Sequence, residues 1–376
     1  MRSLLLLLGC VVLAVAGCSG DTGDPGPAPA ARTAAVRGDL DELLRIGAVG
    51  AIATLTENGR TTTVAAGTAD IRTGQPVSTD RPQHVRVGSV AKTFVAAIVL
   101  QLVDAGTIAL DEPIDSYLPG LLTGDGVDGR AITVRQLLQH RSGLPELSED
   151  PQIEEYRAAQ SGRTFTPDEE IAIALRRPAK FAPGSRYEYT NTNFIVAAML
   201  IERITGHSYT DELQARILTP LGLTGTYLPA AGELDLREPH PIGYSDIDGP
   251  HTDVTRIEPS VPWAAGALVS TGADLNRFFT ALERGEVVPP AQLREMLDGV
   301  PMGSSLFQSG RYYGLGLMYG DLPCGVRYLG HDGGIDGFIA IAGATSDGRA
   351  VTISATGSVD EDGVDPLRML GHALCP

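Results

Sequence analysis

Ser89 and Lys92 are the residues whose types and spacing point most directly to chemistry. They lie three residues apart, just before an apolar run from 94 to 103. If that run is a helix, both side chains share a helical face in its first turn, where the positive end of the helix dipole lies beside the serine hydroxyl. A lysine amine in that position can take the serine proton, which is one way to activate a weak nucleophile.

The use of lysine in this chain strengthens that interpretation. Lysine occurs only at 92 and 180, so the other 27 of the 29 basic residues are arginine. Arginine cannot give up its proton and serve as a base, whereas a buried lysine can. The plainer alternative is a helix start with a solvated lysine, because a Ser-x-x-Lys quartet arises easily by chance.

Two later stretches offer partner groups for the serine. Tyr189 and Asn191 lie two apart in a loop-like stretch, 181–191, so both can point the same way from an extended chain. A phenol near a lysine ammonium has its ionised form favoured, so Tyr189 is expected to act as a base near neutral pH. Asn191 can donate and accept at once, which suits an amide or ester. His331 lies in a glycine-rich stretch, 328–337, and is a candidate donor or acid. Turn hydrogen bonds and a structural histidine are the alternatives.

Composition limits the class of protein. The chain has 376 residues, enough for one large domain or two interleaved subdomains. Hydrophobic residues make up 43% and charged residues 20%, which is typical of a globular protein. The net charge of −17 argues against binding to nucleic acid and against electrostatic adhesion to anionic lipid.

The first residues read as a targeting segment. Residues 1–17 contain one early arginine and an apolar run too short to span a membrane, as in a signal peptide. The small residues before Cys18 look like a lipobox, so Cys18 is expected to carry lipid and to anchor the protein outside the cytoplasm on the cell membrane. Ordinary cleavage and secretion are the alternative. Residues 18–36 are rich in Gly, Pro, Ala and Asp, which predicts a flexible tether to a folded domain at 37–376.

Two cysteines remain for the folded domain. Cys10 leaves with the signal peptide and Cys18 takes the lipid, so Cys324 and Cys375 form a single pair in an oxidising compartment. A disulfide between them is predicted, and it would contribute about 4 kcal/mol on the loop-entropy model. Two buried free thiols are the alternative.

The order of patterns predicts the fold class. Hairpins are expected at Asn58-Gly59 and at 346–348, near the two ends of the chain. Helices are expected between and beside them, with a polar loop at 146–162. The helices are expected to begin or lie at 38–46, 94–103, 132–140, 166 onward, 193–205, 211–218, 274–283, 290–297 and 365–374. The prediction is an α+β fold: an antiparallel sheet from both termini (37–85 and 300–376), flanked by helices, with an inserted, mostly helical subdomain at 86–299.

Three motifs together carry a resemblance. Ser89-Val90-Ala91-Lys92, Tyr189-Thr190-Asn191 and His331-Asp332-Gly333 have the order and approximate spacing of the motifs of serine penicillin-recognising hydrolases. The chain resembles, over about 40 to 375, the subfamily of class C β-lactamases, esterases, D-aminopeptidases and D-alanyl-D-alanine carboxypeptidases. The blocks 86–90, 191–194 and 321–325 are most similar to the actinomycete carboxypeptidases, which also carry a disulfide between the matching cysteines.

The resemblance implies a β-lactamase/transpeptidase-like fold and an acyl-enzyme mechanism. Ser89 would attack a carbonyl while Lys92 and Tyr189 move its proton, and the N–H groups of Ser89 and Gly334 would form the oxyanion hole. His331 would take the place of a lysine found in related enzymes. Substrate-binding positions would be Asn191, Trp263, Asp332, Gly333 and Gly334. No metal or cofactor is expected. The protein is expected to be a monomer. Its expected substrate is a peptidoglycan stem peptide, a β-lactam or an ester.

The departures from the family pattern concern the substrate. The carboxypeptidases bind a terminal carboxylate with hydroxyls, and here those positions hold Asp332 and Gly334. The position of their carboxylate-binding arginine falls within 318–320, which has no cation, and Arg327 is a candidate substitute. The leading hypothesis is a D-alanyl-D-alanine carboxypeptidase-like enzyme. The alternatives are an esterase, a D-aminopeptidase or a β-lactamase and, outside enzymes, a β-lactam-binding cell-wall protein.

Overall fold

The computed structural model describes residues 30–305, 308–360 and 363–375. The predicted signal peptide, Cys18 and residues 18–29 of the predicted tether lie outside the described residues. Within the described ranges, no helix combines the length and the apolar character needed to cross a bilayer.

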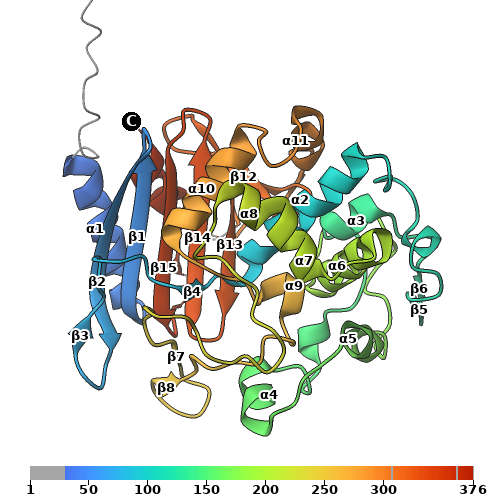
Figure 1. Cartoon of the computed structure of the whole chain (residues 1–376), viewed down its shortest axis with the longest axis horizontal. Helices are drawn as coiled ribbons and strands as arrows, with labels where there is room; N and C mark the ends of the chain where they lie inside the picture. The colour runs from blue at the N-terminus through green and yellow to red at the C-terminus, as the bar shows by residue number, and fades with distance from the viewer. Residues whose placement is uncertain (1–29, 306–307, 361–362, 376) are drawn as a thin grey trace, which may run out of the picture.

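The fold is built on a sheet of nine antiparallel strands in the order β10-β11-β12-β13-β14-β15-β1-β2-β3 (Figure 1). Because β1 pairs with both β2 and β15, strands from the two ends of the chain are neighbours, as predicted. The strands are β1 (Ala48–Glu57), β2 (Arg60–Asp70), β3 (Gln75–Pro76), β10 (Val300–Pro301), β11 (Arg311–Tyr313), β12 (Met318–Asp321), β13 (Arg327–Ile335), β14 (Phe338–Thr345) and β15 (Ala350–Gly357). Short pairs elsewhere join β4 (Val85–Arg86) to β9 (Val269–Ser270), β5 (Thr123–Gly124) to β6 (Val127–Asp128), and β7 (Tyr244–Ser245) to β8 (Thr252–Asp253).

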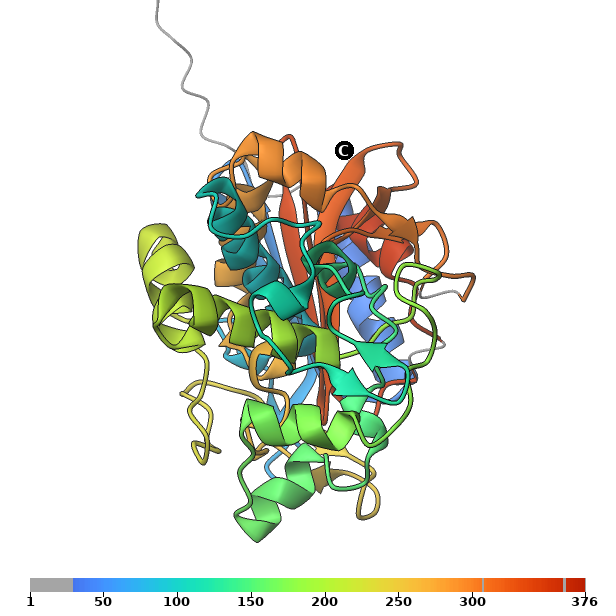
Figure 2. The ribbon, with the colours of Figure 1, turned by 90° about the vertical axis from the view of Figure 1, so that its right-hand side faces the viewer.

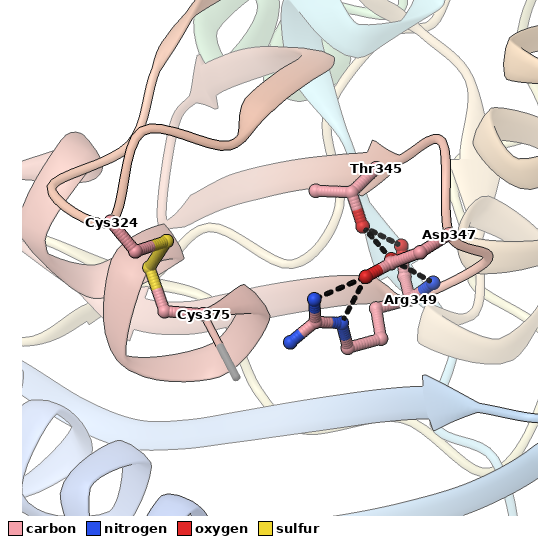
Figure 3. The surroundings of a disulfide bond; sticks show 5 residues. All are labelled: Cys324, Thr345, Asp347, Arg349 and Cys375. Atoms are coloured by element: carbon pink, nitrogen blue, oxygen red, sulfur yellow. Dashed lines mark hydrogen bonds and ion pairs between the residues drawn. A yellow bond between two sulfur atoms is a disulfide. The ribbon is translucent and has the colours of Figure 1, made fainter.

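Both predicted hairpins are present. Asn58 and Gly59 connect β1 to β2 with φ angles of 51° and 75°, the positive values that a tight two-residue turn of the I′ type requires. The turn between β14 and β15 is held by Asp347, whose carboxylate accepts hydrogen bonds from the Thr345 hydroxyl at 2.6 Å and Arg349 Nε at 2.9 Å (Figure 3). Local turn chemistry therefore sets the pairing at both ends of the chain.

Helices cover both faces of the sheet. The terminal helices α1 (Ala30–Arg45) and α12 (Pro366–Leu374) lie together on one face, and α10 (Gly272–Glu283) lies on the other (Figure 2). The buried Asp39 carboxylate of α1 holds α12 by accepting from Arg368 Nη1 at 2.7 Å and by contacting His372 Nδ1 at 2.9 Å.

Helix α1 begins earlier than the sequence pattern suggested. The helix was expected from 38, after a flexible tether that ended at 36, but residues 30–36 are already helical. Alanines at 31, 34 and 35 favour a helix, and Val36 is fully buried, so these residues gain both propensity and packing. The last seven residues of the predicted tether therefore belong to the folded domain.

The predicted disulfide is present. Cys324 and Cys375 are bonded, with their Cα atoms 6.0 Å apart (Figure 3). The bond ties the connection between β12 and β13 to the residue that follows α12. It therefore fixes the chain's C-terminal end beside the start of β13, the strand that carries residues 331–334.

The helical subdomain surrounds α2, which is buried along nearly all of its length. Phe94 of α2 stacks on Phe278 of α10 with ring centroids 3.8 Å apart, which joins this subdomain to the sheet. Its elements are η1 (Gly88–Val90), α2 (Ala91–Asp104), η2 (Ile114–Ser116), α3 (Val134–Leu138), η3 (Leu147–Glu149), α4 (Glu155–Ser161), α5 (Pro167–Ala174), α6 (Thr192–Thr205), α7 (Tyr209–Leu213), η4 (Gln214–Leu218), α8 (Thr219–Leu221), α9 (Trp263–Gly266) and α11 (Pro290–Met296).

Three of these α-helices lie outside the predicted ranges: α4, α8 and α9. Helix α4 lies inside the expected loop 146–162, where Glu154 caps it by accepting from the backbone N–H groups of Tyr156 and Arg157 at 2.9 Å and 2.7 Å. Helix α9 has only four residues. Glutamate is a less common N-cap than Ser, Thr, Asp or Asn, so the usual signal for a helix start was missing for α4.

Candidate active site

Glycines let the chain bring Ser89 against strand β13. Gly88 has a φ of 51°, and a Cβ added there would lie 2.7 Å from the Gly334 carbonyl oxygen. A Cβ on Gly333 would lie 2.0 Å from the Val87 carbonyl oxygen and 2.7 Å from the Ser89 nitrogen. The two backbones can touch in this way only where side chains are absent, so the Ser89 N–H comes to lie beside the backbone of 333 and 334.

Lys92 lies one helical turn below the partly exposed Ser89. Its side chain is fully buried, and its Nζ is 2.9 Å from Ser89 Oγ, 2.7 Å from Asn191 Oδ1 and 2.8 Å from the Ala265 carbonyl oxygen. Burial lowers the pKa of Lys92 to about 7, although the Glu146 carboxylate opposes this change. A large fraction of the amine is therefore neutral at physiological pH.

The three contacts of Lys92 determine where its lone pair points. The Ala265 carbonyl can only accept a hydrogen bond, and Asn191 presents its own carbonyl oxygen because its amide nitrogen donates to Glu146 Oε1 at 3.2 Å. A neutral amine has two hydrogens and one lone pair. The two carbonyl oxygens use both hydrogens, so the lone pair remains for the hydroxyl proton of Ser89.

Tyr189 lies close to both Ser89 and Lys92. Lys92 Nζ is 5.0 Å from its ring centroid, and its hydroxyl oxygen is buried without a well-formed hydrogen bond within the described ranges. Burial raises the pKa of Tyr189 well above its ordinary value, although a contact with the Ser89 hydroxyl opposes the rise. This direction argues against the expected role of Tyr189 as a base near neutral pH, and that role remains a prediction. A largely neutral Lys92 gives little charge to stabilise a phenolate, so the neutral form of the phenol, which can donate a proton, is favoured.

Six of the predicted site residues line one cavity of about 660 Å³. They are Ser89, Tyr189, Asn191, Asp332, Gly333 and Gly334. Lys92 lies in the wall of this cavity, in contact with Ser89 and Asn191. The segments that meet here are η1 with the start of α2, the residues before α6, and β13, so separate parts of the chain assemble around one hydroxyl oxygen.

His331 is not among the residues that line the cavity. It is fully buried, its Nε2 lies 3.0 Å from the Tyr313 hydroxyl, and its Nδ1 lies 2.5 Å from the Asp332 carbonyl oxygen. Burial lowers its pKa to about 3, so the ring is neutral. The ring is enclosed by the Tyr313 hydroxyl on one side and by the backbone of its own strand on the other. Its catalytic role remains a prediction, and the structure gives it no direct access to a substrate in the cavity.

Trp263 and Arg327 are also placed differently from what was expected. The Trp263 ring packs against Tyr209, with centroids 6.0 Å apart, and is not one of the residues that line the cavity. Its helix α9 contributes instead through the Ala265 carbonyl that holds Lys92. Arg327 is exposed, bonds Asp321 at 3.0 Å and is not one of the residues that line the cavity.

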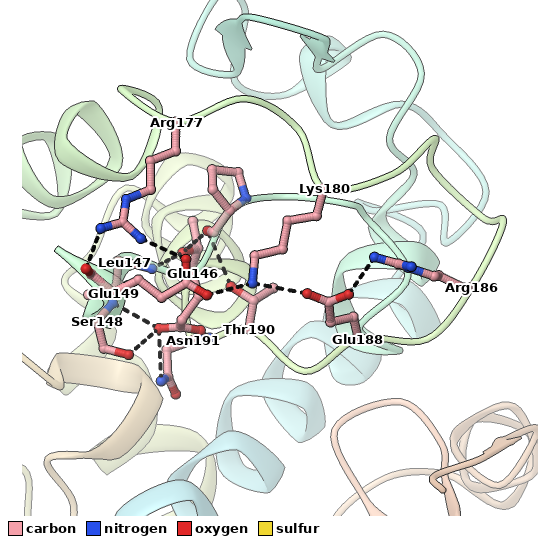
Figure 4. A network of polar contacts seen from close by, with 12 residues as sticks. Glu146, Leu147, Ser148, Glu149, Arg177, Lys180, Arg186, Glu188, Thr190 and Asn191 are labelled. Atoms are coloured by element: carbon pink, nitrogen blue, oxygen red, sulfur yellow. Dashed lines mark hydrogen bonds and ion pairs between the residues drawn. The ribbon is translucent and has the colours of Figure 1, made fainter.

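Two residues that the sequence did not single out complete the site. Glu146 Oε2 accepts from the Asn191 backbone N–H at 2.5 Å, and its Oε1 accepts from the Asn191 side chain (Figure 4). Arg311, on β11, forms a buried ion pair with Asp332. Neither residue belongs to a recognisable motif. Each reaches the site through a contact with a residue more than 20 positions away in the sequence.

Comparisons with known proteins agree with this geometry. A family model described as Beta-lactamase matches residues 34–373. Penicillin-binding protein 4 of Amycolatopsis lactamdurans is 29% identical over 286 residues, which cover 73% of this chain and 71% of that protein. Esterase EstB of Burkholderia gladioli is 31% identical over 246 residues, covering 60% of this chain and 62% of the esterase. A solved D-stereospecific amidohydrolase from Streptomyces sp. has a TM-score of 0.81 and 34% identity, covering 91% of this chain and 98% of that one.

Proposed function

The chain belongs to the serine β-lactamase and penicillin-binding protein family and is a serine hydrolase, and on this basis we propose that it hydrolyses D-amino acid amides and esters with uncharged leaving groups. One observation carries the choice of leaving group. None of the described residues that line the cavity is Lys, Arg or His. The side chain among them that carries a carboxyl group is that of Asp332. A cavity of this kind attracts neutral or amine-bearing substrates more readily than a leaving group with a free carboxylate.

The proposed reaction starts at the Ser89–Lys92 pair. Ser89 Oγ attacks the carbonyl carbon as Lys92 Nζ takes the hydroxyl proton, and the N–H groups of Ser89 and Gly334 receive the oxyanion. Tyr189 donates its proton to the leaving nitrogen or oxygen and is reprotonated from the Lys92 ammonium. Water then attacks the acyl-enzyme, with the same amine as the base, to regenerate Ser89. Protons balance, and the residues of this chain supply each transfer.

A matched panel of substrates tests this proposal. D-alanine amide, L-alanine amide and an N-acyl-D-alanyl-D-alanine peptide are compared by kcat/KM, with Ser89→Ala as the blank. The D-amide should be hydrolysed at least about 10-fold faster than either of the others, because a difference of 1.4 kcal/mol in transition-state binding gives that ratio. Faster release of D-alanine from the peptide than from the amide would overturn the proposal.

The second candidate is the D-alanyl-D-alanine carboxypeptidase first expected from the sequence. It is supported by the similarity to a penicillin-binding protein and by the disulfide between Cys324 and Cys375. It requires a cation for the terminal carboxylate, and Arg311 can serve only if Asp332 ceases to neutralise it. The same substrate panel distinguishes the two candidates.

We also propose that the mature protein is lipid-anchored outside the cytoplasm through Cys18 and acts as a monomer. The small residues before Cys18 and the apolar run that precedes them support the anchor. Globomycin-sensitive processing and labelling with palmitate, both lost in Cys18→Ala, would support it. Full release of the unmodified protein into the medium would contradict it.

A further inference from the structure

Arg311 and Asp332 form an ion pair inside the wall of the active-site cavity. Arg311 Nη2 contacts Asp332 Oδ2, and the two side chains are 0% and 4% exposed. Arg311 also donates from Nε to the Tyr328 hydroxyl at 2.8 Å and contacts Met318 Sδ at 3.1 Å. The arginine is therefore held behind the cavity wall by two residues that line the cavity, Asp332 and Met318.

The Arg311–Asp332 pair buries the permanent positive charge of a guanidinium. A guanidinium keeps its proton at every pH of interest, so burying it requires a counter-charge nearby. Burial raises the pKa of Asp332, and the Arg311 guanidinium opposes that rise. The stable arrangement is an ionised Asp332 against Arg311, which leaves this part of the wall without net charge.

Asp332 is also close to Tyr189, the residue proposed to protonate the leaving group. It directly precedes Gly333, and Gly334 lies next to it on the same face of β13. Asp332 and Tyr189 line the same cavity, and the charge of Asp332 contributes to raising the pKa of the Tyr189 phenol. In the proposed function Tyr189 protonates the leaving group, so the leaving group departs beside Asp332.

We propose that Asp332 is a specificity-determining residue that closes the cavity to leaving groups bearing a carboxylate, because it neutralises the buried cation of Arg311. The inference deepens the proposed function, since it assigns the preference for uncharged leaving groups to one ion pair. Removing the charge of Asp332 while keeping Arg311 would expose a cation that accepts such a carboxylate.

The test uses two esters that differ only in one charge. N-acyl-D-alanyl-D-lactate carries a free carboxylate on its leaving group, and its carboxamide does not. The measured quantity is the ratio of kcat/KM for the carboxylate over kcat/KM for the carboxamide. Esters are used because they report on Ser89 acylation even if amides prove not to be substrates. Failure of the proposed amide hydrolysis is thereby distinguishable from failure of this inference.

Two single variants should affect the ratio differently. Asp332→Asn should raise it at least about 10-fold, because a cation then faces the carboxylate. Arg311→Gln should leave it within about twofold of the wild type, because the buried acid takes up a proton when its cation is removed and the wall stays uncharged. The double variant should behave like Arg311→Gln. A purely structural role would change both substrates equally and leave the ratio alone.

Stability does not decide the outcome, because the ratio is measured within each protein preparation. Thermal melting of each variant gives the folded fraction, and activity on the carboxamide shows that the folded fraction is competent. If Asp332→Asn does not fold, Asp332→Ser, which also removes the charge and keeps Arg311, takes its place. A ratio unchanged within twofold in a folded variant that lacks the Asp332 charge and keeps Arg311 would overturn the proposal.

Discussion

The two lysines of the chain occupy opposite environments at the ends of one short segment, 180–191. Lys92 is fully buried and contacts Asn191 at one end of the segment, and burial lowers its pKa to about 7. Lys180 lies at the other, partly exposed end, which we call the rim, and bonds Glu149 at 2.7 Å and Glu188 at 2.9 Å (Figure 4). Partial burial lowers its pKa, but the two carboxylates outweigh this effect and raise it.

The difference shows that position, and not residue type, makes a base. Acids from one short segment, which comprises Glu146 and η3, interact with both lysines but in different ways. Glu149 contacts the Lys180 ammonium directly, whereas Glu146 reaches Lys92 only through Asn191. An amine without a direct counter-charge can be neutral at pH 7, and an amine with two of them cannot. Lys180 therefore links two surface segments by ion pairs, and Lys92 is a candidate general base.

The largest expected effect is at Lys92. Lys92→Met removes the amine with little change in volume, so acylation of Ser89 should fall about 1,000-fold or more, in the upper range for loss of a general base. The rate of labelling by a fluorescent penicillin measures this loss. Lys92→Arg should be equally inactive because arginine cannot give up its proton. Activity of the arginine variant near the wild-type level would show that charge, and not basicity, is what the site needs.

Tyr189→Phe should have the next largest effect, and it should depend on the leaving group. Hydrolysis of an amide needs a proton on the leaving nitrogen, so the loss should be about 100-fold. A p-nitrophenyl ester departs as a stable anion, so its loss should be much smaller. The two kcat values measured side by side test this difference. Equal losses for both substrates would assign Tyr189 to positioning instead of proton donation.

Glu146→Gln should mainly shift the pH dependence of kcat/KM. The carboxylate favours the protonated form of Lys92, so its removal should lower the pKa of the amine further. The acid limb of kcat/KM should then shift to lower pH, while the rate at the optimum changes by less than about 10-fold, since glutamine can still accept from Asn191. A shift to higher pH would mean that Glu146 acts on Lys92 in some other way.

The smallest effect is expected at the rim. Lys180→Met removes two ion pairs but touches no group of the cavity, so kcat/KM should stay within about twofold. The free energy of unfolding should fall by at most about 1 kcal/mol, the usual range for such pairs. Urea unfolding measures the second quantity. A large kinetic defect would mean that the rim network controls the position of Asn191.

Local features could be predicted from the sequence because they depend on neighbouring residues. The spacing of Ser89 and Lys92, the Asn58-Gly59 hairpin and the Thr133 helix start are of this kind, and the capping box at Thr133 and Gln136 is present. A single pair of candidate cysteines left little choice of partner for Cys324.

The features that could not be predicted from the sequence are contacts between residues that lie far apart along the chain. Arg311 meets Asp332 through the pairing of β11, β12 and β13, and Ala265 meets Lys92 across 173 residues. The contacts that bury His331 come from Tyr313 on another strand and from the backbone of Asp332, and no single-sequence pattern gives that packing. The electrostatics of the site come from burial, so the neutral Tyr189 also required the folded structure.

The dependence of Ser89 acylation on pH tests the central claim most directly. With a neutral ester as substrate, kcat/KM is measured between pH 5 and pH 10 for the wild type. Because the base is active when deprotonated, the rate should rise with pH through an apparent pKa of about 7 and then level off. A rate that is flat from pH 5 to pH 9, or that rises only near the ordinary lysine value of about 10.4, would show that Lys92 is not the base that activates Ser89.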